Sequence, residues 1–422
     1  MHETAAERQV SSGAPVLAWR NGRHRSNHAR LNRDSAFWVA DAKKEVIDIH
    51  DFIIVGGGIA GASAGFALAE FGKVLLLERE SQFGYHSTGR SAAVFLKSHG
   101  PDVIRALASA SKAFFLNPPD GFTDYPLLKP RGMLLIGGHD DRTELDRAAE
   151  ECARYVAGVR RLNAEETRKM VPVLRNEYLG GAVYDPEAMD IEVHSLHYGF
   201  LRGLRARGGE TVTDAELIGV EHAPGGWTVR TPSGNFEGRV LVNAAGAWCD
   251  KVAALAGAEP VGLVPKRRTV FIFQPPAGIP IENWPVVHDI HETFYFKPDA
   301  GRILASPADE TAMAPCDVYP DDVDIAAAID RIQHCARLPV AHIERKWAGL
   351  RSFVGDGCPV VGYDPRIDGF FWIAGQGGYG IETSPAMGRL SASLAAGKGI
   401  PGDLADLGVH TETVSSARFA QR

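Results

Sequence analysis

The chain has 422 residues, of which 45% are hydrophobic and 23% charged, as is ordinary for a globular protein of two or three domains. Its net charge of -7 argues against a general nucleic-acid binder, no apolar stretch is long enough to span a membrane, and no signal peptide is visible. Five cysteines without paired or metal-like spacing predict reduced thiols, no metal site and a cytoplasmic location.

Residues 1–48 precede the first recognisable motif. Their apolar residues show no clear period, and the stretch is basic, with arginines at Arg20, Arg23, Arg25, Arg30 and Arg33. Several acidic residues weaken its interpretation as a targeting leader. We predict a loose extension that flavin binding and turnover do not need, with a targeting or partner-binding arm as the alternative.

Residues 52–78 carry a nucleotide-binding pattern. The apolar run 52–55 predicts a buried strand. The spacing G-x-G-x-x-G follows it, formed by Gly56, Gly58 and Gly61. In that order, these glycines permit a tight turn, the close approach of a pyrophosphate and the close packing of a helix.

The elements after these glycines complete the pattern. A helix is predicted over about 61–71, with its N-terminus toward the phosphates, and a second strand over 74–77. Glu78 ends that strand, where a carboxylate can accept hydrogen bonds from a ribose. Because strand, loop, helix, strand and acid occur in this order, a dinucleotide site is predicted rather than a simple glycine-rich turn.

Residues 84–94 read Gly-Tyr-His-Ser-Thr-Gly-Arg-Ser-Ala-Ala-Val. Small and hydroxyl residues suit a backbone that passes close to a flat ligand. Arg90 could pair with a phosphate. The alternative is a polar loop with a capping serine.

The middle of the chain predicts alternation between two domains. Residues 98–189 predict helices over 103–115, 143–156 and 164–170 and a strand over 131–136. The next stretch predicts a helix over 190–206 and strands over 211–220, 227–230 and 238–245. Beyond it, strands are predicted over 265–273, 294–298 and 302–305, and a helix over 322–338.

The last motif spans 370–385. A buried strand over 370–374 precedes a loop with four glycines, and a helix is predicted over about 385–396. The partial positive charge of a helix N-terminus would stabilise negative charge on a ligand at that loop.

Together these stretches resemble the flavoprotein family of D-amino-acid oxidases, sarcosine oxidases and amino-acid dehydrogenases, and most of all the bacterial D-arginine dehydrogenases. The resemblance covers about residues 51–404. Its motifs are 84–93, 114–119, 241–250, 265–268, 294–295, 347–353 and 376–381.

The resemblance implies an α/β plus α+β protein with a Rossmann-type FAD-binding domain and a discontinuous antiparallel-sheet substrate domain. The first would comprise 49–97, 190–264 and 345–412, and the second 98–189 and 265–344. The cofactor would be non-covalent FAD. The residues expected to bind it are Gly56, Gly58, Ile59, Ala60, Gly61, Glu78, Arg79, Ser87, Thr88, Arg90, Ser91, Ala92, Ala93, Leu217, Ala245, Gly246, Gly375, Gly377, Gly378, Tyr379, Gly380 and Ile381.

Two arginines stand where the chain crosses between these domains. Arg268 and Arg351 can bind a substrate carboxylate bidentately, although a lone arginine is more often a solvated surface charge. The resemblance makes them a carboxylate clamp and Tyr295 a pocket hydroxyl. Further pocket candidates are Val94, His99, Gly132, Gln376 and Glu382.

One departure from the D-arginine dehydrogenases bears on the substrate. Those enzymes meet the cationic end of arginine with a glutamate, at about the position of Gly132 here. Val94 and His99 also stand where those enzymes have a histidine and a tyrosine. Since a buried guanidinium without a partner is costly, a smaller, neutral or different amino acid is expected.

The expected reaction is oxidation of the CH–NH2 group of an amino acid, of the D series, to an imino acid that hydrolyses to a 2-oxo acid and ammonia. Bound FAD would accept the hydride. No general base stands out beyond His99, Glu382 or water, and the electron acceptor, whether quinone, dye or oxygen, stays open. The alternatives are oxidation of a secondary amine, a 2-hydroxy-acid dehydrogenase and a non-enzymatic flavin-bearing binding subunit.

Overall fold

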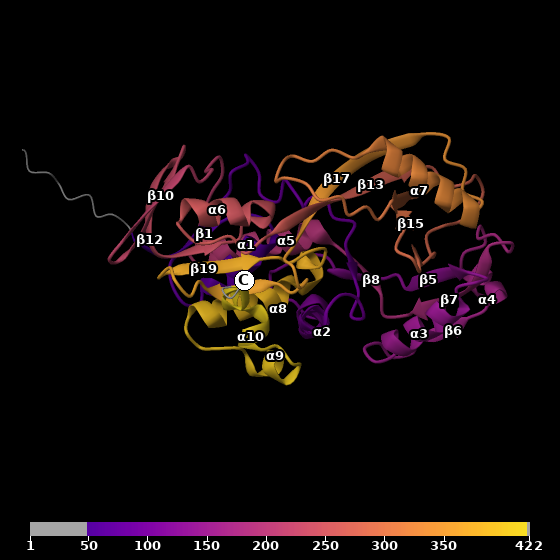
Figure 1. Ribbon diagram of the computed structural model, residues 1–422, viewed down its shortest axis with the longest axis horizontal. Helices are drawn as coiled ribbons and strands as arrows, with labels where there is room; N and C mark the ends of the chain where they lie inside the picture. Colours follow the sequence, from indigo (N-terminus) through magenta and orange to yellow (C-terminus); the bar gives the residue numbers. More distant parts are fainter. Residues whose placement is uncertain (1–48, 420–422) are drawn as a thin grey trace, which may run out of the picture. The chain divides into compact units, whose positions relative to one another are not determined.

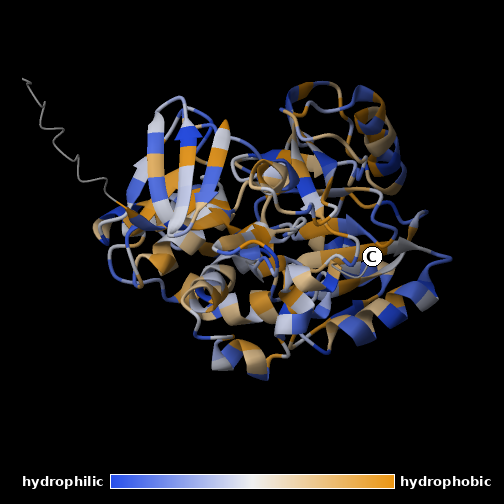
Figure 2. Ribbon diagram, turned by 60° about the vertical axis from the view of Figure 1, so that its left-hand side comes forward, coloured by the Kyte–Doolittle hydropathy of each residue, from blue (hydrophilic) through white to orange (hydrophobic). Residues whose placement is uncertain are grey.

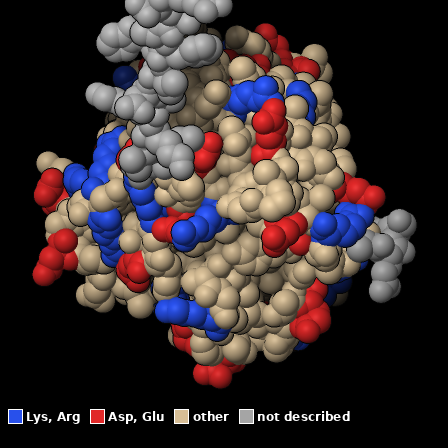
Figure 3. Space-filling model, turned by 90° about the vertical axis from the view of Figure 1, so that its left-hand side faces the viewer, with Lys and Arg blue, Asp and Glu red and all other residues tan. Residues whose placement is uncertain are grey.

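The computed structural model describes residues 49–419, which fall within one compact unit, Ile47–Arg422. The extension predicted over residues 1–48 lies outside the described residues. Between residues 49 and 419, none of the helices combines the length and apolarity needed to cross a bilayer. On the face shown in Figure 3, acidic and basic side chains are interspersed.

The first sheet comprises β1 (His50–Val55), β2 (Val74–Leu77), β9 (Glu210–Val212), β10 (Gly219–Ala223), β11 (Gly226–Thr231), β12 (Gly234–Asn243), β18 (Val360–Tyr363) and β19 (Phe370–Ala374). β1 pairs in parallel with both β2 and β12, and β9 and β19 extend this parallel part (Figure 1). β10, β11 and β18 are antiparallel additions. The apolar runs without alternation are typical of parallel strands that are buried on both faces.

Helices cover both faces of this sheet. They are α1 (Ile59–Leu68), α2 (Asp102–Leu116), α5 (Val193–Ala206), η1 (Gly246–Trp248), α6 (Cys249–Leu255), α8 (Gly380–Ala395), α9 (Gly402–Asp406), α10 (Thr411–Val414) and η2 (Ser416–Phe419). Ile54 and Leu76 pack in one core with α1, α2, α5 and α8. Ile53 and Leu75 pack in the other with α6. Consecutive residues of a strand thus pack on opposite faces of the sheet, because side chains alternate along a strand.

The second sheet runs in the order β17–β13–β16–β15–β14–β5–β7–β6. Its strands are β5 (Met133–Gly138), β6 (Arg160–Leu162), β7 (Leu179–Asp185), β13 (Val264–Phe273), β14 (Val286–Asp289), β15 (Tyr295–Asp299), β16 (Arg302–Ser306) and β17 (Ile343–Phe353). The associated helices are α3 (Arg142–Cys152), α4 (Ala164–Met170) and α7 (Asp322–Cys335). A third, small sheet joins β3 (Val94–Phe95), β8 (Met189–Ile191) and β4 (Leu128–Pro130).

Hydrophobic residues concentrate on the central strands, whereas hydrophilic residues recur along the outer turns of the helices and on the strands that project at the upper left (Figure 2). This distribution is that of amphipathic helices around buried sheets. The predicted α/β plus α+β class, with a Rossmann-type parallel sheet and a second, mostly antiparallel sheet, is confirmed.

The last long helix begins earlier than predicted. α8 starts at Gly380 rather than near Pro385, which lies inside it. A proline cannot donate to the carbonyl four residues before it, here that of Ile381. The Ser384 hydroxyl donates to that carbonyl instead, at 2.9 Å, so the helix continues through the proline. The N-terminus of α8 consequently lies within the glycine-rich loop itself.

Two segments pack with a different sheet from the one that the predicted domain boundaries imply. α2, which was assigned to the second domain, packs in the core of the first sheet against α8. β17, which was assigned partly to the first domain, pairs along β13 in the second sheet. Periodicity shows that a helix has an apolar face but not which core receives it. The two-domain division itself stays a proposal, now with α2 in the first domain and β17 in the second.

Candidate functional site

A long cavity, called the first cavity here, lies at the carboxyl ends of the parallel strands. Segments that are distant in the sequence meet there: the turn after β1, Glu78 after β2, the loop 84–92, the turn after β12 and the loop after β19. In an open parallel sheet, the crevice beyond the carboxyl ends of the strands is where ligands bind. The four predicted motifs are therefore brought together at one place.

The turn between β1 and α1 leaves room for a ligand at only one of its glycines. Gly56 has a φ of +111°, and a Cβ there would lie 2.4 Å from the Ala244 carbonyl oxygen. A Cβ on Gly58 would meet only the Thr88 hydroxyl, at 3.2 Å. Gly58 also lines the cavity and precedes α1, whose first N–H, that of Ile59, donates to the Thr88 hydroxyl at 3.0 Å. The partial positive charge of this helix N-terminus favours an anion such as a pyrophosphate.

Glu78 lies buried at the end of β2. Its two oxygens accept hydrogen bonds from the backbone N–H groups of Gly57 and Glu80, each at 2.9 Å. Burial raises the pKa of Glu78, and these two hydrogen bonds oppose the increase. Each carboxylate oxygen can accept a further bond, so ribose hydroxyls could be bound there.

Two buried polar atoms on the wall of the first cavity have no partner among the described residues. They are Gln376 Nε2 and Ser352 Oγ. Buried polar groups are nearly always paired, so their state indicates a polar ligand beside them. Ser352 is held near the glycine loop, because its carbonyl accepts from Gly377 N at 2.9 Å. With the N-terminus of α1 and Glu78, these atoms fit FAD.

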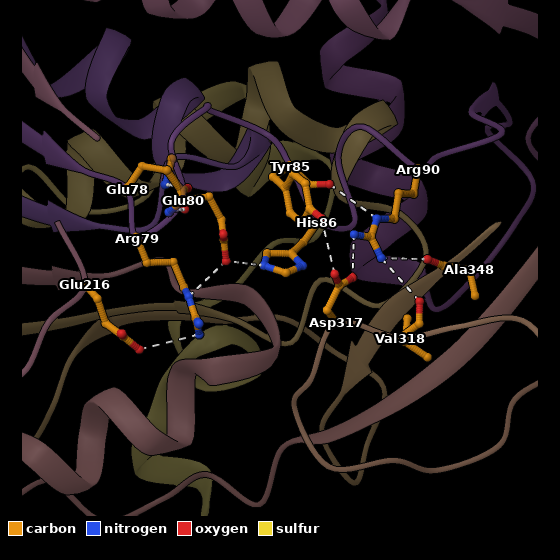
Figure 4. Close-up of polar contacts among 11 residues, drawn as sticks. Glu78, Arg79, Glu80, Tyr85, His86, Arg90, Glu216, Asp317, Val318 and Ala348 are labelled. Carbon is orange, nitrogen blue, oxygen red and sulfur yellow. Dashed lines mark hydrogen bonds and ion pairs between the residues drawn. The ribbon is translucent and has the colours of Figure 1, made fainter. Parts of the chain in front are cut away.

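Arg90 is not available to a phosphate, contrary to the prediction. Its guanidinium donates to Asp317 at 2.6 Å and to the carbonyl oxygens of Val318, Ala348 and Tyr85 at 3.2–3.3 Å (Figure 4). These bonds occupy most of its donors. Arg90 instead fastens the loop 84–92 to β17, and so positions the loop beside the cavity.

Most of the other predicted cofactor residues lie around the first cavity. All of them line the first cavity except Gly61, Ala93 and Tyr379. Gly61 faces β1, where a Cβ would lie 1.9 Å from the Gly56 carbonyl oxygen. Ala93 and Tyr379 line a neighbouring cavity instead.

Sequence reasoning did not assign Trp248, which lines the first cavity at the start of α6. The Arg79 guanidinium lies over its ring, 5.1 Å from the centroid, and also pairs with Glu80 and Glu216 (Figure 4). Trp248 belongs to the motif 241–250, and its place in that motif was the sequence feature that could have identified it as a cofactor-site residue. Only the fold shows that its ring reaches the cavity wall.

The neighbouring cavity, called the second cavity here, has a volume of about 480 Å³. Seven residues line both cavities, so the two adjoin: Ser91, Ala92, Arg268, Tyr295, Arg351, Gly378 and Ile381. Part of its wall is a row across the second sheet, in which Tyr295 pairs with His288, His288 with Leu135, and Leu135 with Val183. The predicted clamp residues therefore stand where the two cavities meet.

The two clamp arginines differ in their availability. Within residues 49–419, no hydrogen bond or ion pair engages the Arg351 guanidinium. Burial, and then the nearby Arg268, lower its pKa. Arg268 donates to the Asp309 carbonyl oxygen at 3.0 Å and to Glu310 at 3.1 Å. Among the described residues Arg351 thus has no hydrogen-bond or ion-pair partner at the junction of the cavities, although Tyr295, Tyr379 and Glu310 partly offset the lowering of its pKa, whereas Arg268 is paired with Glu310.

The other predicted pocket residues do not all line the same cavity. Tyr295 is 8% exposed and stacks on His288, with ring centroids 5.7 Å apart. His99 and Val94 line the second cavity. Burial, then His288 and Arg351, lower the pKa of His99 to about 3, so its imidazole is neutral near pH 7. Gln376 lines the first cavity only.

Gly132 lines neither cavity, contrary to the prediction. It precedes β5, and a Cβ there would lie 2.8 Å from the ring of Tyr184. The next residue, Met133, faces the second cavity instead. Because side chains alternate along a strand, an error of one residue moves a position to the other face.

Glu382 lies in the first turn of α8 and lines the second cavity. Its Oε2 accepts from Leu96 N at 2.8 Å. Burial raises its pKa to about 8, although the Leu96 hydrogen bond and Arg351 oppose the increase. A carboxyl group in this state can hold or release a proton near neutral pH.

The raised pKa of Glu382 predicts a pH-dependent stability. The folded chain keeps a proton that the unfolded chain, with a pKa near 4.5, has lost. The free energy of unfolding should therefore fall as the pH rises from about 4.5 to about 8, by up to about 1.4 kcal/mol per pH unit. The free energy of unfolding of Glu382→Gln should not fall in this way. The difference in free energy of unfolding, variant minus wild type, should therefore increase from pH 5 to pH 8. Urea unfolding at both pH values measures this, with Glu412→Gln in α10 as control. An equal difference at both values would contradict the assignment.

Comparison with known proteins bears on this site. The family described as FAD dependent oxidoreductase matches residues 51–394. A glycine oxidase of Bacillus licheniformis is 26% identical over 367 residues, which cover 82% of this chain and 93% of that protein. An L-2-hydroxyglutarate dehydrogenase of Escherichia coli is 30% identical over 226 residues, or 50% of this chain and 51% of that protein.

Among solved structures, an L-proline dehydrogenase from P. horikoshii has a TM-score of 0.74 at 20% identity. The match covers 89% of this chain and 99% of that one. At this identity the likeness concerns the fold.

Proposed function

This chain belongs to the FAD-dependent oxidoreductase family, and on that premise we propose that it oxidises the CH–NH2 group of an amino acid of the D series. The glycine oxidase among its relatives supports an amino-acid substrate. The resemblance of its motifs to those of D-arginine dehydrogenases supports the D configuration. The product would be an imino acid, which reacts with water to give a 2-oxo acid and ammonia.

The observation that carries this proposal is the Arg351 guanidinium, which has no hydrogen-bond or ion-pair partner among the described residues and stands where the two cavities meet. A buried charge of this kind is costly unless a ligand pairs with it. A carboxylate can accept two parallel hydrogen bonds from the planar guanidinium of an arginine. The residue therefore suits a substrate that carries a carboxylate beside the reacting carbon.

The chain's own residues would hold and orient the reactants. Gly58, the start of α1 and Glu78 would hold the nucleotide part of FAD, with Gln376 and Ser352 beside them. When bound, FAD supplies a hydride acceptor. Arg351 would fix the substrate carboxylate, and orientation of this kind can lower a barrier by roughly 7 to 11 kcal/mol. Tyr295 would offer its hydroxyl at the same junction.

The substrate amine must be neutral when hydride leaves, because a protonated nitrogen cannot stabilise the developing cation. Both His99 and Glu382 line the second cavity. Glu382, with a pKa of about 8, can accept a proton there once it is ionised, whereas His99, with a pKa of about 3, is a weak proton acceptor. We propose no single base from this pair, and water could serve as well.

A substrate screen tests the proposal. Pairs of D- and L-amino acids, their N-methyl derivatives and 2-hydroxy acids would be mixed anaerobically with the flavoprotein, and bleaching of the flavin absorbance followed. D-amino acids should bleach it fastest. Repeating turnover with a dye and then with oxygen alone would separate a dehydrogenase from an oxidase. If 2-hydroxy acids bleach the flavin and amino acids do not, the proposal fails.

A second candidate, oxidation of a 2-hydroxy acid, is favoured by the 30% identity to an L-2-hydroxyglutarate dehydrogenase. Arg351 would bind the carboxylate of such a substrate equally well. That relative is matched over only half its length, so the amino-acid proposal is preferred.

The cofactor is expected to be bound without a covalent link. All five cysteines lie in the described part of the chain, and none lines the first cavity. Acid precipitation of the purified protein should therefore release a yellow supernatant that contains FAD. A pellet that keeps its flavin absorbance after washing would contradict this expectation.

A further inference from the structure

Asp185, the last residue of β7, is a buried carboxyl group with one unused oxygen. It is 1% exposed, and its Oδ1 accepts from Glu187 N at 2.7 Å. Its Oδ2 is buried and has no hydrogen-bond partner among the described residues. Asp185 also lines the second cavity. A carboxylate oxygen in this position is costly to leave unpaired, so it indicates a donor that enters the cavity.

The other charged side chains around this part of the cavity already have partners. Arg105 donates to Glu151 at 2.7 Å and to the Tyr155 hydroxyl at 3.0 Å. Glu187 accepts from Lys112 and Lys97. Burial raises the pKa of Asp185, while backbone hydrogen bonds from Glu187 and Ala188 and the charge of Lys97 oppose the increase, and a cation bound beside it would lower that pKa further. Among the described residues Asp185 forms no ion pair, because Lys97 is paired with Glu187.

Asp185 lies away from the clamp along the second sheet. It pairs with Met133 on β5, and the sheet then continues through β14 to β15, which carries Tyr295. Three steps between neighbouring strands separate β7 from β15, about 14 Å at roughly 4.8 Å each. The Tyr295 and Asp185 side chains take up part of that span. A ligand must therefore be extended to reach from the carboxylate clamp to Asp185.

We propose that Asp185 determines substrate specificity by binding a positively charged, hydrogen-bond-donating group at the far end of an extended amino-acid substrate. The inference rests on the proposed function, because it needs a carboxylate held at Arg351. An amine or a guanidinium would satisfy Oδ2, whereas a glycine-sized substrate would leave it unpaired. The expectation of a neutral substrate, which rested on Gly132, is thereby revised: the acid stands on the neighbouring strand.

Ligands that cannot be oxidised at the carbon beside the carboxylate test this directly. Two ω-amino carboxylates, 6-aminohexanoate and 8-aminooctanoate, would be titrated into the flavoprotein beside hexanoate and octanoate, with Kd taken from the flavin difference spectrum. In the wild type at least one amino compound should bind roughly 10- to 100-fold more tightly than its matched carboxylate. Asp185→Asn should abolish that preference and leave binding of the plain carboxylates unchanged. Asp146→Asn, which removes an exposed acid of α3 outside the cavities, is the matched control.

Turnover gives a second measurement. D-lysine and D-arginine would be compared with D-norleucine, and their kcat/KM advantage should disappear in Asp185→Asn while D-norleucine is unaffected. The wild-type series stands by itself if the variant does not fold. If the wild type shows no preference for a cationic end, or if Asp185→Asn keeps it, the role of Asp185 is refuted while amino-acid oxidation stands. If no amino acid reduces the flavin, the proposed function fails and this inference with it.

Discussion

Arg351→Met is expected to lower kcat/KM for the amino-acid substrate by about two to three powers of ten while the protein keeps its flavin. Removing one partner of a buried charge pair costs roughly 3 to 5 kcal/mol, and about 1.4 kcal/mol corresponds to each tenfold change. The fold should tolerate the change, because no described residue depends on the Arg351 guanidinium for a hydrogen bond or ion pair. Steady-state kinetics and the flavin-to-protein ratio measure the two expectations.

Variants at and near this position sharpen the test. Arg351→Lys should restore activity only in part, because an ammonium lacks the planar fork. Arg345→Met removes an exposed arginine from the same strand, outside both cavities, and should be neutral. Arg268→Met should cost less than Arg351→Met, because Glu310 already shares the charge of Arg268. Normal turnover by Arg351→Met would show that the clamp is assigned wrongly.

Gly58→Ala is expected to yield a folded protein that has lost most of its FAD. The φ of Gly58 is -74°, which alanine adopts readily, and the added Cβ would meet only the Thr88 hydroxyl at 3.2 Å. The same Cβ would stand at the start of α1, where the pyrophosphate must approach the backbone. FAD affinity should fall at least about tenfold, as measured by fluorescence titration of the apoprotein. Circular dichroism should remain that of the wild type.

Two other glycines give this experiment its controls. In Gly61→Ala, the Cβ would lie 1.9 Å from the Gly56 carbonyl oxygen, so the chain should misfold rather than merely lose FAD. In Gly402→Ala, at the start of α9, the Cβ would meet nothing within 4 Å, so fold and flavin should both be kept. Full FAD binding by Gly58→Ala would show that the pyrophosphate does not pass this turn.

The cofactor and the parallel sheet that binds it could be predicted from local sequence patterns. The glycine spacing, the two apolar strands and Glu78 lie within about thirty residues, and each element has a local physical requirement. Such short-range patterns can be read without knowing the rest of the fold. The strand over 370–374 and the glycine loop after it were predicted for the same reason.

How the charged side chains are used depends on the fold. Arg90, Arg268 and Arg351 look alike in sequence, yet Arg90 holds a loop against β17, Arg268 is paired with Glu310, and Arg351 has no hydrogen-bond or ion-pair partner among the described residues. Likewise, Asp185 lies more than fifty residues after Gly132 and lines the second cavity because β5 pairs with β7. The availability of a charge depends on which distant groups reach it, and long-range strand pairing, rather than local pattern, determines those groups.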